Sequence, residues 1–124
     1  MGKRKENSTN SINENFLNET CGIAYTLSLI GGRWKINILS YLINEHKLRY
    51  SELRSRLTGI SERMLISKLK ELESDGLVNR IVHPQVPPKV EYELTTLGKS
   101  FEDILNLMAD WGDKNHKKDN TMAL

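Results

Sequence analysis

The 124-residue sequence has one cysteine, three prolines and a formal net charge of only +2. A single cysteine excludes an intramolecular disulfide framework and fits a reducing compartment. No apolar run is long enough to cross a bilayer, and no signal-peptide core follows the N-terminal lysines, so we expect a cytoplasmic protein that does not enter a membrane. The small net charge does not indicate a polyanionic partner by itself, so that question depends on where the cations lie.

The sequence also lacks the local motifs of an enzyme or a metal site. Cys21 together with His46, His83 or His116 could in principle form a hydrolase or bind a metal. However, there is no nucleophile elbow, no Cys-x-x-Cys pair and no pair of histidines at helical spacing. We therefore expect no catalytic activity, no metal and no cofactor.

The length is that of one domain. Residues 1–18 are rich in Asn, Ser, Glu and Lys, so they are expected to form a flexible polar tail, and residues 117–124 are expected to form a flexible C-terminal tail. The folded domain is then expected to span residues 19–116.

Residues 61–75 are predicted to form an amphipathic helix. Ser61 is a good N-cap, and Gly76 supplies the left-handed residue that commonly ends a helix. At 3.6 residues per turn, three leucines share the core side of this helix: Leu65, Leu69 and Leu72. The opposite side carries cations and hydroxyls with one apolar neighbour: Arg63, Ser67, Lys70, Ser74 and Ile66. Taken alone, such a face could simply be solvated.

The segments around this helix favour a more specific interpretation. A short predicted helix, 51–57, and a glycine-containing turn precede it, which is helix-turn-helix spacing. Two strand-like runs, 77–83 and 90–94, follow it and are joined by a stiff proline-rich tip. Residues 48–50 could add a third strand. The pattern predicts an α+β, mostly helical, winged helix-turn-helix whose second helix lies in the major groove of double-stranded DNA.

The predicted helix-turn-helix is the basic part of the chain. From His46 to Lys70 there are seven Lys or Arg and two acids, a surplus of five cations. Arg63 and Lys70 suit guanine edges or phosphate, Ser67 suits either, and Ile66 suits a thymine methyl group. Three further cations are better candidates for phosphate, which positions a protein without reading sequence: Arg54, Arg56 and Lys89.

Two helices are predicted before the helix-turn-helix. Ile23, Leu27 and Ile30 repeat at helical spacing, and Gly31 and Gly32 end that helix. The next helix opens near Trp34, which is expected to anchor packing. The two cations that flank the tryptophan, Arg33 and Lys35, are expected to be solvated.

One long final helix is predicted from Thr95 or Thr96 to about His116. Its apolar residues form a heptad-type seam that could pack on the core of its own chain or on a second copy. We predict a homodimer formed by this helix and the first one. The predicted dimer interface contains Ile23, Leu27, Phe101, Ile104, Leu105, Met108 and Trp111, and Leu97 continues the seam.

The chain resembles the HxlR-type winged helix-turn-helix transcriptional regulators, which are similar to the MarR group. The resemblance covers roughly Cys21 to Gly112. It lies in separate pieces that occur in the right order: Cys21, Ile30–Lys35, Gly59–Ser61, Leu69–Val78, Val86–Tyr92, Leu94–Thr95 with Leu97–Gly98, and Trp111–Gly112. The chain departs from the usual family residues at Gly22 (often proline), His83 (usually tyrosine) and Lys89 (usually arginine).

The resemblance implies sequence-specific DNA binding by a homodimer. A dimer would present its two second helices to successive major grooves of an inverted repeat, and repression is the commoner outcome for small dimers that lack an activation surface. The alternative is a winged helix used only for protein contacts, and the local cation surplus argues against it. In several relatives a cysteine that matches Cys21 senses oxidants or electrophiles. Cys21 could therefore react with a thiol-reactive small molecule or bond to a second subunit, since a helix start favours an anion. Alternatively, Cys21 is a small buried apolar residue.

Overall fold

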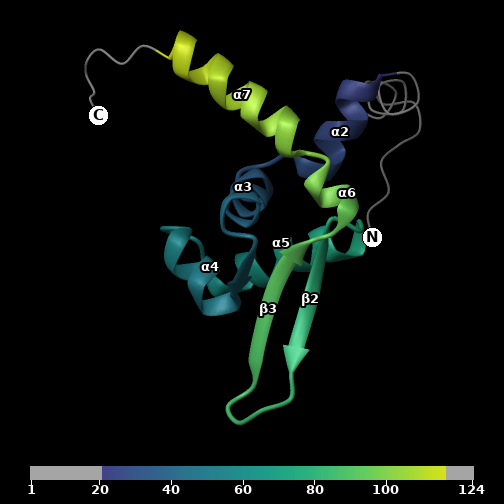
Figure 1. Ribbon diagram of the computed structural model, residues 1–124. Helices are drawn as coiled ribbons and strands as arrows, with labels where there is room; N and C mark the ends of the chain where they lie inside the picture. The colour runs from purple at the N-terminus through teal and green to yellow at the C-terminus, as the bar shows by residue number, and fades with distance from the viewer. Residues whose placement is uncertain (1–20, 117–124) are drawn as a thin grey trace, which may run out of the picture.

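The computed structural model describes residues 21–116, so both predicted tails lie outside the described residues. The helices and strands are α2 (Gly22–Ile30), α3 (Lys35–Glu45), β1 (Lys47–Arg49), α4 (Tyr50–Arg56), α5 (Glu62–Ser74), β2 (Val78–His83), β3 (Lys89–Leu94), α6 (Thr96–Lys99) and α7 (Glu102–Asn115). Figure 1 shows α3, α4 and α5 grouped at the root of a long hairpin, with α2 and α7 at the other end of the molecule. This arrangement confirms the predicted winged helix-turn-helix.

The apolar side of α5 forms the centre of the core. Leu65, Leu69 and Leu72 are each at most 2% exposed, which confirms their predicted burial. They pack in one cluster with α3 residues such as Ile38 and Leu39. Because these side chains are removed from water, burial of the stripe is the main force that holds α5 against the rest of the domain.

The ends of α5 follow the predicted local signals. The Ser61 hydroxyl accepts a hydrogen bond from the Met64 backbone N–H at 3.0 Å, so Ser61 is the N-cap. Gly59 in the turn before α5 has a φ of +90°, and Gly76 after it has a φ of +79°. Both values lie in the left-handed region that favours glycine, so these two residues set the entry and exit of the helix.

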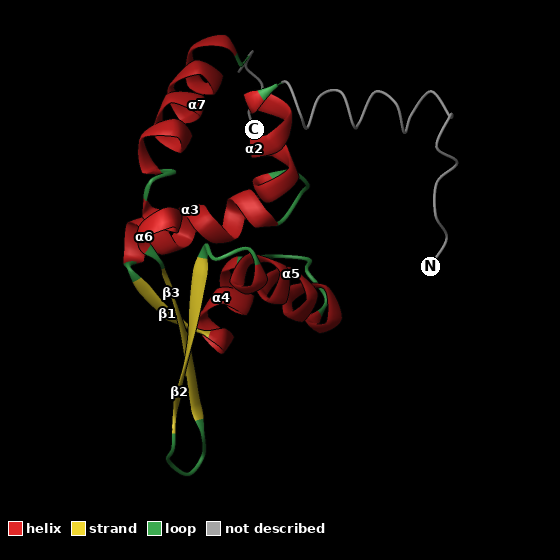
Figure 2. Cartoon of the chain, turned by 90° about the vertical axis from the view of Figure 1, so that its right-hand side faces the viewer, coloured by secondary structure: helices red, strands yellow, loops and turns green. Residues whose placement is uncertain are grey.

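The wing is a three-stranded antiparallel sheet in the order β1-β3-β2. Leu48 of β1 pairs with Tyr92, and β2 pairs with β3 from Val78 opposite Leu94 to His83 opposite Lys89. The predicted third strand therefore exists. The β2–β3 hairpin projects well beyond the helices (Figure 2), and Val86 at its tip is 98% exposed.

The prediction of one long final helix is wrong, because α6 and α7 are separate helices with different directions (Figure 1). The Thr95 hydroxyl caps α6 by accepting from the Gly98 N–H at 3.0 Å. At the junction the Phe101 N–H donates to the Gly98 carbonyl at 3.1 Å, a tighter turn than that of an α-helix. Gly98 lies so close to the Leu77 carbonyl that a Cβ atom would clash with it, which fixes the direction of α6.

The predicted seam is consequently divided between two environments. Phe101 is 6% exposed and Leu105 is 9% exposed, and both belong to the core of their own chain. Their assignment to a dimer interface is therefore corrected, because a side chain buried within one protomer offers no surface to a second. The other members of the seam remain exposed.

The residues around Trp34 contain a second correction. Trp34 packs partly buried against the core, as predicted, and the Arg33 guanidinium lies 4.4 Å from the centre of its ring. Lys35, however, is only 7% exposed, and its Nζ lies 2.8 Å from Oε1 of Glu71 in α5. Lys35 was expected to be solvated. It is instead buried because a carboxylate from a distant part of the sequence neutralises it.

Candidate DNA-binding surface

The outward side of α5 is exposed and cationic. It contains Arg63, Ser67, Lys70 and Ser74, with Ile66 beside them at 40% exposure, and we call these five residues the reading face. Within residues 21–116, the recorded ion pairs involve other cations and leave Arg63 and Lys70 without a carboxylate partner. Unpaired cations on an exposed helix face are available to an external anion.

Neighbouring cations of the helix-turn-helix are already paired. Arg56 donates from Nε to Oε2 of Glu45 at 2.6 Å, and this hydrogen bond is the main reason why the pKa of Glu45 is lowered. Arg54 lies 3.7 Å from Glu62 and keeps a half-exposed side chain. Arg54 therefore stays a candidate for phosphate, whereas the guanidinium of Arg56 is engaged and its predicted phosphate contact loses its support.

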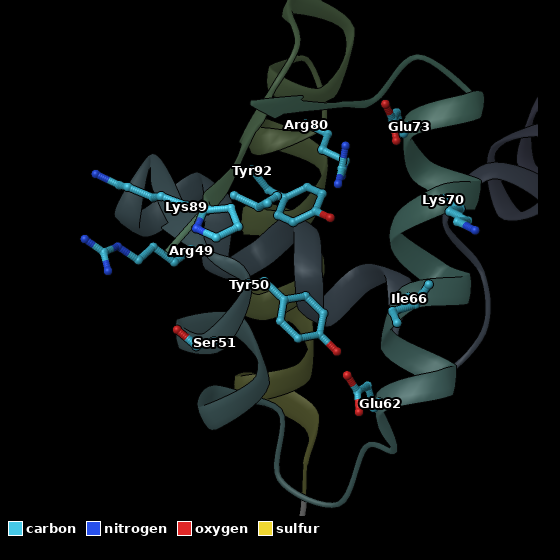
Figure 3. A pocket seen from close by; sticks show the side chains of 12 residues that line it. Arg49, Tyr50, Ser51, Glu62, Ile66, Lys70, Glu73, Arg80, Lys89 and Tyr92 are labelled. Atoms are coloured by element: carbon cyan, nitrogen blue, oxygen red, sulfur yellow. The ribbon is translucent and has the colours of Figure 1, made fainter. Parts of the chain in front are cut away.

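A groove separates α5 from the wing and has a cavity volume of about 750 Å³. We call it the wing groove. It is lined by Arg49, Tyr50, Ser51, Glu62, Ile66, Lys70, Glu73, Arg80, Pro88, Lys89, Val90 and Tyr92. Four of these residues are cations and two are acids, so the groove carries a surplus of positive charge. Figure 3 shows Tyr50 and Tyr92 between the wing and α5, with Arg80 extending toward Glu73.

Sequence reasoning missed Tyr50, Arg49 and Arg80 as surface residues of the site. Arg80 pairs across the hairpin with Tyr92. Since directly opposed residues of an antiparallel pair share one face of a sheet, Arg80 follows Tyr92 onto the groove side. The missing signal was thus the hairpin register, which places Arg80 near a helix that it does not adjoin in sequence.

An ion pair fixes α5 on the side away from the wing groove. Glu71 accepts from Lys35 of α3 at 2.8 Å, and Lys68 lies 3.5 Å from the same oxygen. The hydrogen bond from Lys35 is the largest cause of the lowered pKa of Glu71. The reading face lies between this ion pair and the wing groove, so the ion pair holds α5 on the flank opposite the groove.

A second polar cluster lies at the base of the wing tip. Nε2 of His83 is 2.7 Å from Oε1 of Glu91, and Nζ of Lys89 is 3.8 Å from the other oxygen of that carboxylate. The hydrogen bond with His83 is the main cause of the lowered pKa of Glu91. Lys89 lines the wing groove, and its pairing with Glu91 keeps its ammonium group near the base of the wing tip.

The opposite end of the molecule exposes apolar side chains. Ile23 is 73% exposed and Trp111 is 70% exposed. The exposed apolar residues of α2 and α7, which we call the apolar end face, are Ile23, Tyr25, Leu27, Ile104, Leu107, Met108 and Trp111. Tyr25 and Leu107 were not predicted: Tyr25 lies off the repeat of Ile23, Leu27 and Ile30, and Leu107 lies beside Met108 at the edge of the predicted seam. Cys21 is the partly exposed N-cap residue of α2 and so lies beside this face.

Residues 21–116 contain no group of three or more His, Cys, Asp or Glu side chains that could hold a metal ion. None of the helices found between those residues combines the length and the apolar character needed to cross a bilayer.

The family model described as HxlR-like helix-turn-helix matches residues 29–120 of this chain. The chain belongs to this family. Its relatives in Bacillus subtilis (strain 168) include two uncharacterized HTH-type transcriptional regulators. YybR is 47% identical over 97 residues, covering 78% of this chain and 77% of that protein. YtcD is 52% identical over 87 residues, covering 70% of this chain and 68% of that protein.

Solved structures agree with the family assignment. The oxidized form of the redox regulator HypR is 45% identical and superposes with a TM-score of 0.72, covering 77% of this chain and 98% of that chain. Its reduced form superposes with the same TM-score and covers 75% of this chain and 91% of that chain. The HxlR-family chain described here is thus a transcriptional regulator with a helix-turn-helix DNA-binding fold, and the resemblance stated from its sequence is confirmed.

Proposed function

We propose that this regulator reads a specific DNA sequence with the reading face of α5. The observation that carries the proposal is the exposure of Arg63 and Lys70 without carboxylate partners among the described residues. Arg63 and Lys70 suit guanine O6 and N7, Ser67 suits a base or a phosphate, and Ile66 suits a thymine methyl group. Arg54 and Lys89 suit phosphates beside the reading face.

The protein acts as a homodimer in this proposal. A second copy is the occupant that best fits the apolar end face, since large exposed apolar patches mark interaction sites and a two-fold axis makes one patch self-complementary. The wing tip projects from the opposite end of the chain (Figure 2), so dimerisation leaves both reading faces free. Two such faces about 34–36 Å apart would fit successive major grooves of an inverted repeat. Bound at a promoter, so small a dimer would repress by excluding other proteins.

DNA binding is tested with the purified protein and the intergenic DNA upstream of its own gene. Because each neutralised phosphate releases counterions, the affinity should fall steeply as the salt concentration rises. Arg63→Ala should weaken specific binding, while Lys99→Gln, which removes a cation on α6 away from the reading face, should not. Absence of salt-dependent DNA binding would favour the alternative of a protein-contact module.

Oxidation at Cys21 is the proposed signal. Its thiol is partly exposed beside the apolar end face, and HypR, at 45% identity, is a redox regulator with solved oxidized and reduced forms. Two routes are open. The thiols of two subunits can give two protons and two electrons to a thiol oxidant and form an intersubunit disulfide, or Cys21 can form a mixed disulfide with a small thiol-reactive molecule.

The thiol proposal is tested by measuring DNA affinity before and after treatment with diamide. The wild-type protein should change its affinity on oxidation and recover it with a reductant, whereas Cys21→Ser should not respond. Non-reducing electrophoresis separates the two routes, because only an intersubunit disulfide doubles the mass. An equal response of both proteins would assign Cys21 a packing role.

A further inference from the structure

His83 is the last residue of β2 and lies at the base of the wing tip, opposite Lys89 of β3. Its Nε2 atom is 2.7 Å from Oε1 of Glu91. An ionised carboxylate can only accept a hydrogen bond, so Nε2 carries the hydrogen. In the neutral imidazole Nδ1 then keeps a lone pair, and no hydrogen bond of Nδ1 is recorded within residues 21–116. Nδ1 is therefore the atom at which His83 can take up a proton.

The hairpin register shows which charges surround His83. Successive residues of a strand point to opposite faces of a sheet, so His83 lies on the face opposite to that of Arg80 and Tyr92. Among the described residues, the charged groups that share the face of His83 are Lys47, Arg49, Lys89, Glu91 and Glu93. Figure 3 shows the side chains of Arg49 and Lys89 extending away from α5. This face of the wing thus carries three cations and two acids before His83 is protonated.

Glu91 is shared between His83 and Lys89. One carboxylate oxygen is hydrogen-bonded to His83, and the other lies 3.8 Å from Nζ of Lys89. The hydrogen bond from His83 is the main cause of the lowered pKa of Glu91, so this carboxylate is ionised at neutral pH. While His83 is neutral, the negative charge of Glu91 attracts the Lys89 ammonium. A protonated His83 balances that charge itself and releases Lys89.

This exchange lies on the part of the chain that projects beyond the helices (Figure 2), where Lys89 is a candidate phosphate contact. We propose that DNA binding takes up one proton from solvent at Nδ1 of His83, and that the added charge strengthens the contact between the wing and phosphate. Histidine suits this role because its charge changes between pH 5 and 8. Coupling between two ligands is reciprocal, so a fall in pH should raise the affinity for DNA. The inference rests on the proposed function and adds His83 to it as a positioning residue.

The pH dependence is tested with the upstream intergenic fragment at pH 8, 7 and 6. In 0.1 M salt the affinity of the wild-type protein should rise by up to about eightfold, the counterion release of one additional phosphate contact. His83→Gln keeps a neutral side chain that can donate to Glu91, and it should lose this rise. His116→Gln is the matched control, because it removes a histidine at the end of α7 and should keep the rise. A rise of the same size in His83→Gln would overturn the inference.

The salt dependence separates a charge effect from a structural one. In the wild-type protein the slope of log affinity against log salt should be steeper by about one at pH 6 than at pH 8. In His83→Gln the two slopes should be equal. If His83 served only to hold the hairpin together, its replacement would lower affinity at both pH values and leave the change of slope in place, which would contradict the proposal.

Glu91→Gln tests the release of Lys89. The amide carries no charge, so it no longer attracts the Lys89 ammonium, and the affinity at pH 8 should rise several-fold. Melting temperatures of the variant and the wild-type protein, measured at pH 8, confirm that both are folded. An unchanged or lower affinity of the folded variant at pH 8 would show that Glu91 does not hold Lys89 away from DNA.

Calorimetry counts the proton. The enthalpy of binding to the same fragment at pH 7 is measured in buffers with different enthalpies of ionisation, and its slope against those enthalpies gives the number of protons taken up. We expect uptake in the wild-type protein and in His116→Gln but not in His83→Gln. Uptake that persists in His83→Gln would overturn the inference while leaving DNA binding intact. If the wild-type protein does not bind the fragment at low salt at any of these pH values, the proposed function itself fails.

Discussion

α5 and α7 are two amphipathic helices of similar length, 13 and 14 residues, but they bury their apolar sides to different extents. α5 buries all three residues of its leucine stripe and exposes a polar, cationic face. α7 buries Leu105 alone and leaves Leu107, Met108 and Trp111 at 68%, 47% and 70% exposure. The packing of α5 is therefore complete within one chain, whereas α7 leaves an apolar face uncovered. In the proposed function, the same kind of sequence pattern serves a DNA-facing surface in one helix and an association surface in the other.

The largest effect is expected in the core under α5. Leu69 is 2% exposed, so Leu69→Ala should lower the free energy of unfolding by about 2–5 kcal/mol through lost burial and the cavity left behind. Leu107→Ala is the matched change on the exposed face of α7 and should shift the unfolding of dilute monomer by about 0.5 kcal/mol or less. Urea titrations of both variants measure these effects. Equal costs would show that α7 packs within its own chain.

A charge on the exposed face of α7 should weaken self-association. Trp111→Glu removes a large exposed apolar side chain, so it should weaken self-association by about 2–4 kcal/mol, the range of an aromatic hot spot. Trp111→Phe should restore most of the affinity. Sedimentation velocity over a range of concentrations measures the shift. Unchanged association in Trp111→Glu would exclude the apolar end face as the dimer interface.

Substitutions on the reading face should have a smaller effect, and one that depends on the DNA sequence. Arg63→Ala should cost about 1–3 kcal/mol of binding to the best sequence and relax the preference at one base position. Lys89→Gln should weaken binding to all sequences alike, because a phosphate contact carries no sequence information. Selection from a random DNA library with each variant measures both outcomes. Losses that do not depend on sequence in both variants would refute this division of roles.

The parts of the fold that could be predicted are those with local signals. Ser61 and Gly76 mark the ends of α5 through their own cap and backbone conformation, and the leucine period shows which side is buried. The wing strands were recognisable from β-branched residues and the proline-rich tip. In each case the deciding interactions occur within a few residues, so they can be predicted from the local sequence.

The missed features depend on contacts between segments that are distant in sequence. The break between α6 and α7 follows from the approach of Gly98 to the Leu77 carbonyl and from burial of Phe101. The wing groove depends on the hairpin register that brings Arg80 toward α5. A helical repeat shows that a residue needs burial, but it does not show which surface covers it, so Phe101 and Leu105 were assigned to a partner instead of their own core.

The ion pair between Lys35 and Glu71 should have the smallest effect on stability, and its contribution should depend on pH. Glu71→Ala leaves the Lys35 ammonium buried without its carboxylate, and since Glu71 itself is 43% exposed the expected cost is about 1–2 kcal/mol, between those of exposed and buried pairs. Lys35→Met removes the buried charge altogether and should cost less.

The direction of the pH effect follows from the lowered pKa of Glu71. A carboxyl group whose pKa is lower in the folded state stabilises the fold above its unfolded value, here the ordinary 4.5, and this stabilisation is lost as the pH falls through the folded value. The difference in unfolding free energy between the wild-type protein and Glu71→Ala should therefore be constant at neutral pH and shrink below about pH 4.5. Urea titrations at pH 7 and in steps toward pH 3 test this. A difference that persists unchanged in acid would mean that the Glu71 side chain holds α5 through packing, and that Lys35 is buried for reasons other than its charge partner.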